Sequence, residues 1–329
     1  MHIFYLNIPW IIDQSEYNCS QRTYSEWRSR GSVNEVQGVY FLCSGTLFAI
    51  IYLLAMTAMI RGKLTRIPCY RLMFFNGIID LLDLVDGSFL TAYFHLTGSV
   101  FCTNVALTYF AGHLGWSVWI GATLNCVALA LNRIAEMVPS ASGLKFLFQG
   151  NRLYIWMGIC VAIMIIRMFV TRPFIYNSAV AAYLAAPLIT DDIAWETEYY
   201  TSLLLPIHNI SVAVVLGFLY LFLCLSVLRM TRMTSCSFDK MQLQLFIQAL
   251  VICTTTAIAA LFYVVVEFVA LPRSFVIATN VVWQLSHGVH GFVYICLNKQ
   301  VRTQVRKMIG CAKQTKPIIT VSNTITAVN

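Results

Sequence analysis

Seven long apolar segments dominate this chain and limit what it can fold into. They cover Gly38–Ile60, Leu72–Leu96, Val105–Leu131, Leu153–Val170, Leu203–Leu228, Leu243–Val269 and Phe275–Leu297. Each is close to or above the ~18 to 20 residues that a helix needs to cross the hydrocarbon core of a bilayer. Because lipid offers no partners to unpaired backbone groups, each segment must be helical. Only 11% of the residues are charged, against about 25% in soluble proteins, so we predict an all-α membrane protein, a seven-transmembrane-helix bundle.

Basic residues are distributed unequally between the connections. The connections 61–71, 133–152 and 229–242 and the tail 298–329 hold sixteen Lys and Arg residues, whereas the opposite segments hold five, together with eight acids. Because basic loops stay in the cytosol, this asymmetry predicts a plasma-membrane protein with its N-terminus outside and its tail in the cytoplasm. The expected organisation is an N-terminal segment 1–37, a helical domain 38–297 and the tail 298–329. Orientation therefore explains the net charge of +8 better than binding to nucleic acid does.

A short amphipathic helix is predicted at the start of the tail, over residues 299–309. Val301, Val305, Met308 and Ile309 recur at helical spacing, and the basic residues between them suit an anionic lipid surface. Cys311 follows directly and is either a palmitoylation site or an unmodified thiol.

Two features of the outer segments concern modification and cross-linking. Asn18 opens an N-glycosylation sequon with Cys19 and Ser20, which can be used if the N-terminus lies outside. Cys19 and Cys102 are the cysteines of the outer segments, and disulfides persist in that compartment. Asn18 is therefore a candidate glycosylation site, and Cys19 and Cys102 are a candidate disulfide.

Three acids lie inside the second apolar segment, at Asp80, Asp83 and Asp86. Their spacing gathers them on about a third of the circumference of a helix. Charges at this depth are costly and usually face the bundle interior or a watery cavity. Asp80 is expected near the middle of the membrane. It belongs either to a water or ion site, with sodium as the candidate ion, or to a hydrogen-bonded link between helices; no other metal site or cofactor is predicted.

Further polar residues at this depth are the expected partners of Asp80. They are Asn125, Asn280, Gln284 and His287. The last three share one face of the seventh segment, and polar side chains link helices in lipid by about 0.6–2 kcal/mol each. A structural link is the favoured role for Asn125.

Aromatic and titratable residues gather in the outer thirds of the segments. Pockets between helices are mostly apolar and aromatic, with few converging polar groups. The candidate ligand-binding residues are therefore Asp86, Tyr93, Tyr109, His113, Trp116, His208, Glu267 and Trp283. Among them His113 and Glu267 are favoured. The alternative is a belt of interfacial aromatic residues, which membrane proteins have without any ligand.

Short motifs in a fixed order add a resemblance to a known family. They are Leu129-Ala-Leu-Asn-Arg133 followed by Glu136, Leu147-Phe-Gln-Gly-Asn-Arg152, Phe174-Ile-Tyr-Asn-Ser178, and Trp283-Gln-Leu-Ser-His-Gly288 with Tyr294 and Asn298-Lys299. With the seven spans, they resemble the nematode serpentine receptor class T chemoreceptors of the G-protein-coupled receptor superfamily, from about Tyr40 to Met308. The resemblance implies a rhodopsin-like bundle, an unknown extracellular ligand (a small molecule or a peptide), a heterotrimeric G protein as partner, and a place on sensory neurons.

The resemblance also assigns roles inside the bundle. Arg133 takes the place of the arginine in the Asp-Arg-Tyr motif of rhodopsin-like receptors, and Asn132 replaces the acid beside it. Glu136, one turn further on, is expected to hold Arg133 instead. Tyr294 matches the tyrosine of the Asn-Pro-x-x-Tyr motif, whose proline is missing here, and Asp80 matches the aspartate of the second helix. The resemblance thus makes Arg133, Glu136 and Tyr294 the predicted coupling and switch residues.

Two other classes of function compete with a receptor. A transporter or channel would conduct through the intramembrane acids, but the odd number of spans and the lack of a visible internal repeat count against it. An enzyme is not predicted, because no helix carries paired metal ligands or a nucleophile and base at a recognisable spacing.

Overall fold

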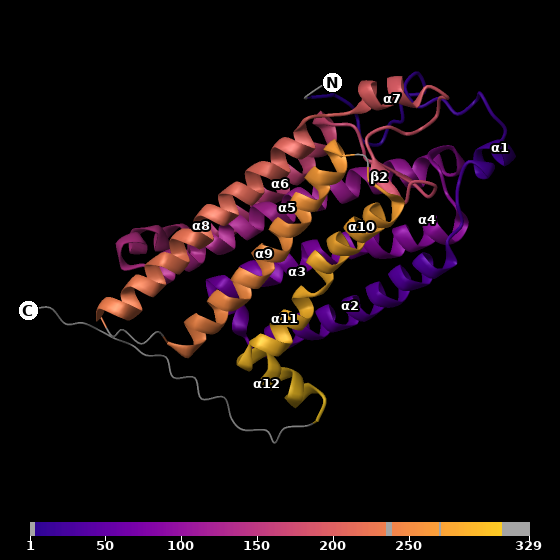
Figure 1. Ribbon diagram of the computed structural model, residues 1–329. Coiled ribbons are helices and arrows are strands. Elements are labelled where there is room, and N and C mark those ends of the chain that lie inside the picture. Colours follow the sequence, from indigo (N-terminus) through magenta and orange to yellow (C-terminus); the bar gives the residue numbers. More distant parts are fainter. Residues whose placement is uncertain (1–3, 235–238, 270, 311–329) are drawn as a thin grey trace, which may run out of the picture.

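The computed structural model describes residues 4–234, 239–269 and 271–310, and these are mainly helical. The predicted apolar segments are helical rods that run alongside one another (Figure 1). They are α2 (Glu35–Arg61), α3 (Pro68–Leu84) with η2 (Val85–Leu90) and α4 (Thr91–Thr97), α5 (Val105–Met137), α6 (Arg152–Val170), α8 (Leu204–Thr234), α9 (Lys240–Phe268), and α10 (Arg273–Gly288) with α11 (His290–Leu297). The predicted fold class is confirmed.

Two of the spans are interrupted. Five helices are long and apolar enough to cross a membrane individually: α2, α5, α6, α8 and α9. The second span instead passes through the π-helical turn η2 between α3 and α4, and the seventh is broken at Val289 between α10 and α11. The length of an apolar segment predicts a span, but it does not predict such interruptions.

Polar side chains fix where several helices begin. Asn34 and Asn104 accept hydrogen bonds from backbone amides in the first turns of α2 and α5, and Asn298 does the same for α12 (Lys299–Met308). These caps satisfy amides that have no partner inside the helix. Pro68 opens α3 at a position where its missing N–H costs nothing.

Apolar and charged side chains are distributed in the opposite way to those of a soluble protein. Leu47, Val214 and Phe218 face outward with 51%, 65% and 72% of their surface exposed, whereas Asp80 and Arg133 are buried. Contiguous apolar surface of this kind needs a non-aqueous surrounding, and buried charges inside the bundle are typical of membrane-spanning helices. The chain is a multi-pass membrane protein.

Helix α5 is the central element of the bundle. In its most apolar window 78% of the residues are buried, against 17% to 33% in the other four membrane-length helices. It packs against α3, α6, α8 and α9. Residues along α5 can therefore contact most of the bundle at every level.

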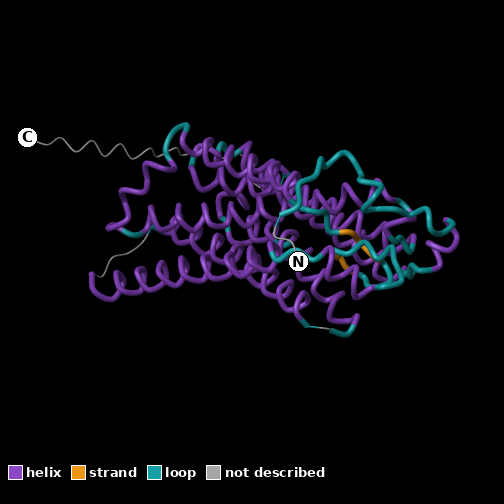
Figure 2. The backbone as a smooth tube through the Cα atoms, turned by 90° about the horizontal axis from the view of Figure 1, so that it is seen from above, coloured by secondary structure: helices purple, strands orange, loops and turns teal. Residues whose placement is uncertain are grey.

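The N-terminal end of the bundle carries a cap made of loops and short elements. These are α1 (Tyr24–Ser29), η3 (Phe101–Thr103), α7 (Ile193–Tyr200) and an antiparallel hairpin of β1 (Ile175–Asn177) and β2 (Ala182–Leu184). Figure 2 shows both strands among the loops at this end. The hairpin is absent from the sequence-based prediction. Its turn is held by Asn177, whose side chain accepts a hydrogen bond from the amide of Ala179 at 2.9 Å.

The opposite end, called the α12 end below, holds η1 (Leu64–Arg66), η4 (Pro139–Phe148) and α12. Helix α12 turns away from the direction of α11 (Figure 1), and Val301 and Val305 are buried against the bundle. The amphipathic helix predicted over 299–309 is therefore confirmed as Lys299–Met308. Cys311, the candidate palmitoylation site, lies outside the described residues.

Candidate functional site

A small cavity, called the inner cavity below, lies between the helices under the β1–β2 hairpin. It leaves about 50 Å³ of room, and its walls are mainly aromatic. They are formed by Asp86, Gly112, Gly115, Trp116, Trp119, Phe174, Tyr183, Leu205, Asn209, Tyr263 and Trp283. Helices α5, α8, α9 and α10 contribute walls together with η2 and the hairpin, so the cavity depends on the whole bundle and its cap.

Asp86 is the carboxylate of this cavity, and it is fully buried. Its Oδ1 accepts a hydrogen bond of 2.9 Å from the Tyr183 hydroxyl, whereas Oδ2 has no hydrogen-bond partner in the described part of the chain. The space around Oδ2 depends on Gly115, because a Cβ at that position would overlap this oxygen. Burying a polar atom without a partner costs several kcal/mol. Oδ2 can thus accept a hydrogen bond from a molecule in the cavity.

A larger space of about 790 Å³, called the vestibule below, lies next to the inner cavity. The two share Tyr183, Leu205 and Tyr263 as walls. The vestibule is enclosed by the hairpin, α7, α8, α9 and α10, and it is lined by Glu198 and Glu267 but by no Lys or Arg among the residues described. Its charged wall residues are therefore acidic.

Half of the predicted ligand-binding residues lie at these two spaces. Asp86, Trp116 and Trp283 line the inner cavity, and Glu267 lines the vestibule. The sequence reasoning did not select Tyr183, because the hairpin that brings it over the cavity was not predicted.

The other four predicted ligand-binding residues line neither of these two spaces. Tyr93 faces out of the bundle, with 41% of its surface exposed. His208 contacts Thr123 Oγ1 at 3.0 Å. His113 packs edge-on against the ring of Tyr109 at 4.9 Å between centroids, under the cap. Tyr109 and His113 share a face of α5 with the cavity residue Trp116, but the cap covers the outer turns of that face.

Within the cap, a disulfide and a buried ion pair hold the N-terminal segment in place. Cys19 and Cys102 are disulfide-bonded, which joins the N-terminal segment to η3. Arg172 and Glu16 pair at 3.0 Å, and their side chains are only 6% and 13% exposed. Tyr199 of α7 donates a hydrogen bond to Glu16 at 2.7 Å, and this bond raises the pKa of the Tyr199 phenol. These contacts hold the parts of the cap together.

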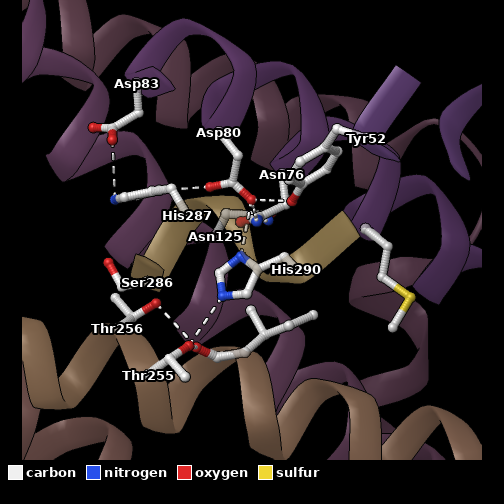
Figure 3. A network of polar contacts seen from close by, with 12 residues as sticks. Tyr52, Asn76, Asp80, Asp83, Asn125, Thr255, Thr256, Ser286, His287 and His290 are labelled. Atoms are coloured by element: carbon white, nitrogen blue, oxygen red, sulfur yellow. Dashed lines mark hydrogen bonds and ion pairs between the residues drawn. The ribbon is translucent and has the colours of Figure 1, made fainter. Parts of the chain in front are cut away.

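Below the inner cavity, Asp80 is the centre of a buried polar network (Figure 3). The Nδ1 atom of His287 lies 2.7 Å from Asp80 Oδ1, and Nδ1 of His290 lies 2.9 Å from Oδ2. Asn76 donates to Oδ2 at 2.6 Å, and the Tyr52 hydroxyl also donates to it. One carboxylate therefore joins α2, α3, α10 and α11.

His287 connects this network to the inner cavity. Figure 3 shows its side chain between Asp80 and Asp83, and its Nε2 lies 3.6 Å from Asp83 Oδ2. Trp119, a wall of the inner cavity, packs edge-on against the same imidazole at 5.7 Å between centroids. The wall of the inner cavity is thus in direct contact with the network.

Helices α5 and α9 join the network from the other side. Asn125 of α5 donates to the Asn76 side chain at 2.9 Å, and the Nε2 of His290 lies 3.0 Å from Thr255 Oγ1 of α9. Asn125 thus reaches Asp80 through Asn76.

Asn280 and Gln284, predicted to join the network, make other contacts. Gln284 donates to Ser88 Oγ at 2.8 Å, and Asn280 accepts from the Tyr263 hydroxyl at 2.9 Å. Both share a helix face with His287, but they lie one and two turns nearer to the N-terminal end, where they meet other helices. A common helix face does not place residues at a common depth.

Four members of the network escaped the sequence reasoning: Tyr52, Asn76, Thr255 and His290. His290 had a signal, because it follows His287 by three residues and so lies near it on the helix surface. Tyr52 had none, since a tyrosine in an apolar span resembles any other membrane aromatic residue.

The break between α10 and α11 depends on glycine rather than on the missing proline. A Cβ on Gly288 would overlap the ring of Phe48, and one on Gly291 would lie 3.1 Å from the backbone nitrogen of Tyr52. These two glycines let the seventh span approach α2 closely, which brings Tyr52 and His290 to the same carboxylate.

Near the α12 end, Arg133 is buried and held by neutral oxygens. It donates to Gln242 Oε1 at 2.9 Å and to Asn132 Oδ1 at 2.5 Å. The expected contact with Glu136 is wrong: Glu136 pairs with Lys145 of η4 at 3.4 Å. The Arg133 side chain turns toward α9, whereas Glu136 turns toward the η4 connection.

Tyr294 links the network to this end of the bundle. Its ring packs edge-on against Tyr52 at 5.8 Å between centroids, and its hydroxyl donates to the Met73 carbonyl at 3.2 Å. Asn298, which caps α12, donates to the Tyr70 hydroxyl at 2.6 Å and to Gln248 at 3.2 Å.

The arrangement is that of a serpentine seven-transmembrane receptor, with a capped cavity at one end of the bundle and a buried arginine near the other. The family model described as "Serpentine type 7TM GPCR chemoreceptor Srt" matches residues 1–318, so the chain belongs to that family. It is also 26% identical to the serpentine receptor class T-55 of Caenorhabditis elegans over 324 residues, which cover 96% of this chain and 87% of that protein. The family resemblance carried by the sequence motifs is confirmed.

Proposed function

We propose that this chain is a chemosensory receptor that binds an extracellular ligand and activates a heterotrimeric G protein. The supporting observation is an unbroken series of contacts from the inner cavity toward the α12 end. Trp119 packs on His287, His287 contacts Asp80, Tyr52 donates to Asp80, and Tyr52 packs on Tyr294. A ligand that changes the cavity wall would therefore act on the residues that hold the seventh span.

Such a ligand has to bind two states of the receptor differently. The ligand would contact Trp119 on α5 and Trp283 on α10. The break at Val289, between α10 and α11, offers a place for rotation. At the other end, Arg133 is bonded to Gln242 of α9. A displacement of α9 would release Arg133 toward the aqueous face, where a G protein would dock.

The proposed orientation has the N-terminus outside, in the plasma membrane of sensory neurons. The basic connections that contain η1 and η4 lie at the α12 end with the basic helix α12, and basic segments stay in the cytosol. Asn18 is exposed on the cap, which suits its proposed glycosylation. A tag at the N-terminus should be stained on intact cells, and a tag at the C-terminus only after permeabilisation.

The sodium ion predicted near Asp80 does not fit the groups around it. Hard cations take oxygen ligands, whereas four side chains already engage the two carboxylate oxygens, and two of them are imidazoles. We propose that His287 and His290 take the place of such an ion.

The test of the proposed function is nucleotide exchange on G proteins in membranes that contain the full chain. Each Gα class is co-expressed, and binding of a non-hydrolysable GTP analogue is measured with and without a panel of small soluble and volatile molecules. Arg133→Ala should lower exchange about tenfold or more at an equal receptor level, because a buried, bonded charge is removed from the coupling face. Arg28→Ala, at an exposed position on α1, is the charge control and should behave like the unmodified chain. No exchange with any Gα class, or full exchange by Arg133→Ala, would contradict the proposal.

A further inference from the structure

The walls of the inner cavity also carry information about the ligand. We propose that this cavity takes a small organic cation, bound through an ammonium group to Asp86. The inference rests on the proposed function, because it names the class of ligand for the same site.

The first argument is the unpartnered oxygen of Asp86. Both side-chain oxygens are buried, yet Tyr183 donates only to Oδ1. A buried carboxylate is costly unless it is paired with a charge and its remaining lone pairs are satisfied. An ammonium group next to Oδ2 provides both, and Gly115 leaves the room that Oδ2 itself needs beside α5.

The second argument is the aromatic wall. Trp119, Tyr263 and Trp283 line the cavity around Asp86, and Tyr263 and Trp283 meet edge-on at 6.0 Å between centroids. Aromatic faces attract cations through the ring quadrupole, by about 0.5 to 2 kcal/mol for each contact. Arg167 already lies over the Trp116 ring at 4.2 Å, so that ring is left out of the aromatic contacts proposed for the ligand.

The third argument is the charge around the cavity. Asp83 is one turn from Asp86 on the same face and is also buried. Glu198 and Glu267 line the vestibule, and the part of its wall that the structure describes contains no basic side chain. Clefts lined by one sign of charge concentrate ligands of the opposite sign, so the vestibule favours a cation over an anion.

The size of the cavity restricts the cation. About 50 Å³ of room is available. The wall at Gly112 has no room to move outward, because even a Cβ there would overlap the Phe174 carbonyl. A compact head group, such as a primary or trimethylated ammonium on a short chain, is therefore the class that fits; a longer tail would extend into the vestibule.

The test compares a cation with an uncharged molecule of the same shape. Choline and its carbon isostere 3,3-dimethylbutan-1-ol are titrated onto the purified full chain in lipid nanodiscs, and the fluorescence of the cavity tryptophans is followed. Propylamine and propan-1-ol form a second pair. At least one cation should bind about tenfold more tightly than its isostere, which corresponds to about 1.4 kcal/mol. Equal affinities within both pairs, or no saturable binding by either cation, overturn the proposal.

Two variants locate the site. Asp86→Asn keeps the shape of the side chain and should abolish the preference for the cation, whereas Gly115→Ala should weaken cation binding because the new methyl group overlaps Oδ2. Gly217→Ala is the matched control, since a Cβ at that helical glycine meets nothing within 4 Å. Thermal unfolding of each variant shows that it is folded. Retention of the preference by folded Asp86→Asn overturns the assignment to Asp86.

The binding assay contains no G protein, so the two proposals can fail separately. Cation binding without nucleotide exchange on any Gα class contradicts the proposed signalling and leaves the cation site standing. Exchange driven only by uncharged or anionic molecules supports the receptor and overturns the cation site.

Discussion

At the scale of single residues, the neutral partners of Arg133 determine how firmly the α12 end of the bundle is held. Its guanidinium is bonded to Gln242 and Asn132, and no carboxylate is among these two partners. Hydrogen bonds to a charged group contribute about 1.5 to 3 kcal/mol, less than the 3 to 5 kcal/mol lost when one partner is removed from a buried ion pair. A receptor held in this way should need little free energy to release Arg133.

Loss of the α9 partner should therefore increase basal signalling. Gln242→Ala removes the acceptor that holds Arg133 toward α9. If the bond favours the resting state by about 1 kcal/mol, the active fraction rises about fivefold. Basal nucleotide exchange at an equal receptor level measures this increase. Gln244→Ala, two residues further along the same helix, is the control, and equal exchange by both variants would show that Gln242 does not restrain the receptor.

Single residues also show where prediction from the sequence succeeded. Asp80 was recognised because a charge in an apolar span has to find partners inside the bundle. Tyr52 and Asn76 were not, since their role depends on which faces of α2 and α3 meet. The Glu136 prediction was wrong because a separation of three residues permits a contact without requiring it, and Lys145 offered the better partner.

At the scale of elements, the interrupted seventh span supplies both imidazoles of the polar network. His287 lies before the break at Val289 and His290 after it, yet both contact Asp80. The break is accommodated by the contact between Gly288 and Phe48. Helix α11 is thus positioned by packing against α2 rather than by a proline.

A methyl group at Gly288 should separate these helices. Gly288→Ala places its Cβ inside the Phe48 ring and should destabilise the folded chain by about 1 to 3 kcal/mol, the usual cost of overpacking. The midpoint of thermal unfolding in nanodiscs measures the loss. Gly217→Ala has open space around its Cβ and should be neutral or slightly stabilising. The double variant Gly288→Ala with Phe48→Ala should recover part of the loss, and an additive effect would contradict the proposed contact.

The elements themselves were predictable to different degrees. Apolar length identified all seven spans because it reflects the thickness of a bilayer. The break at Val289 and the β1–β2 hairpin were not identified, because both depend on contacts between distant parts of the chain. Tyr183 shows the consequence: it comes from a loop of no particular pattern and still supplies the hydrogen bond to Asp86.

At the scale of the whole molecule, the cap supplies walls to both cavities of the bundle. The hairpin supplies Tyr183 to the inner cavity and a side of the vestibule, and α7 supplies another side. Parts of the cap are joined to one another by the Cys19–Cys102 disulfide and by the Arg172–Glu16 pair. Because its parts come from separate loops, their joint position over the cavity could not be inferred from any one segment.

Opening the disulfide should therefore loosen the cap while the spans stay folded. Cys19→Ser, Cys102→Ser and the double variant each remove a cross-link between residues 83 positions apart, and such cross-links typically contribute about 2 to 4 kcal/mol. All three variants should unfold at the same lowered temperature, and a reductant should lower the unmodified chain to that temperature but leave the variants unchanged. Cys296→Ser, at an exposed cysteine outside the disulfide, is the control. Because the backbone hydrogen bonds of a membrane-spanning helix lie within that helix, the helical circular dichroism signal before unfolding should be retained. If the reductant does not change the unfolding temperature of the unmodified chain, and the variants unfold at that same temperature, the disulfide contributes nothing to stability.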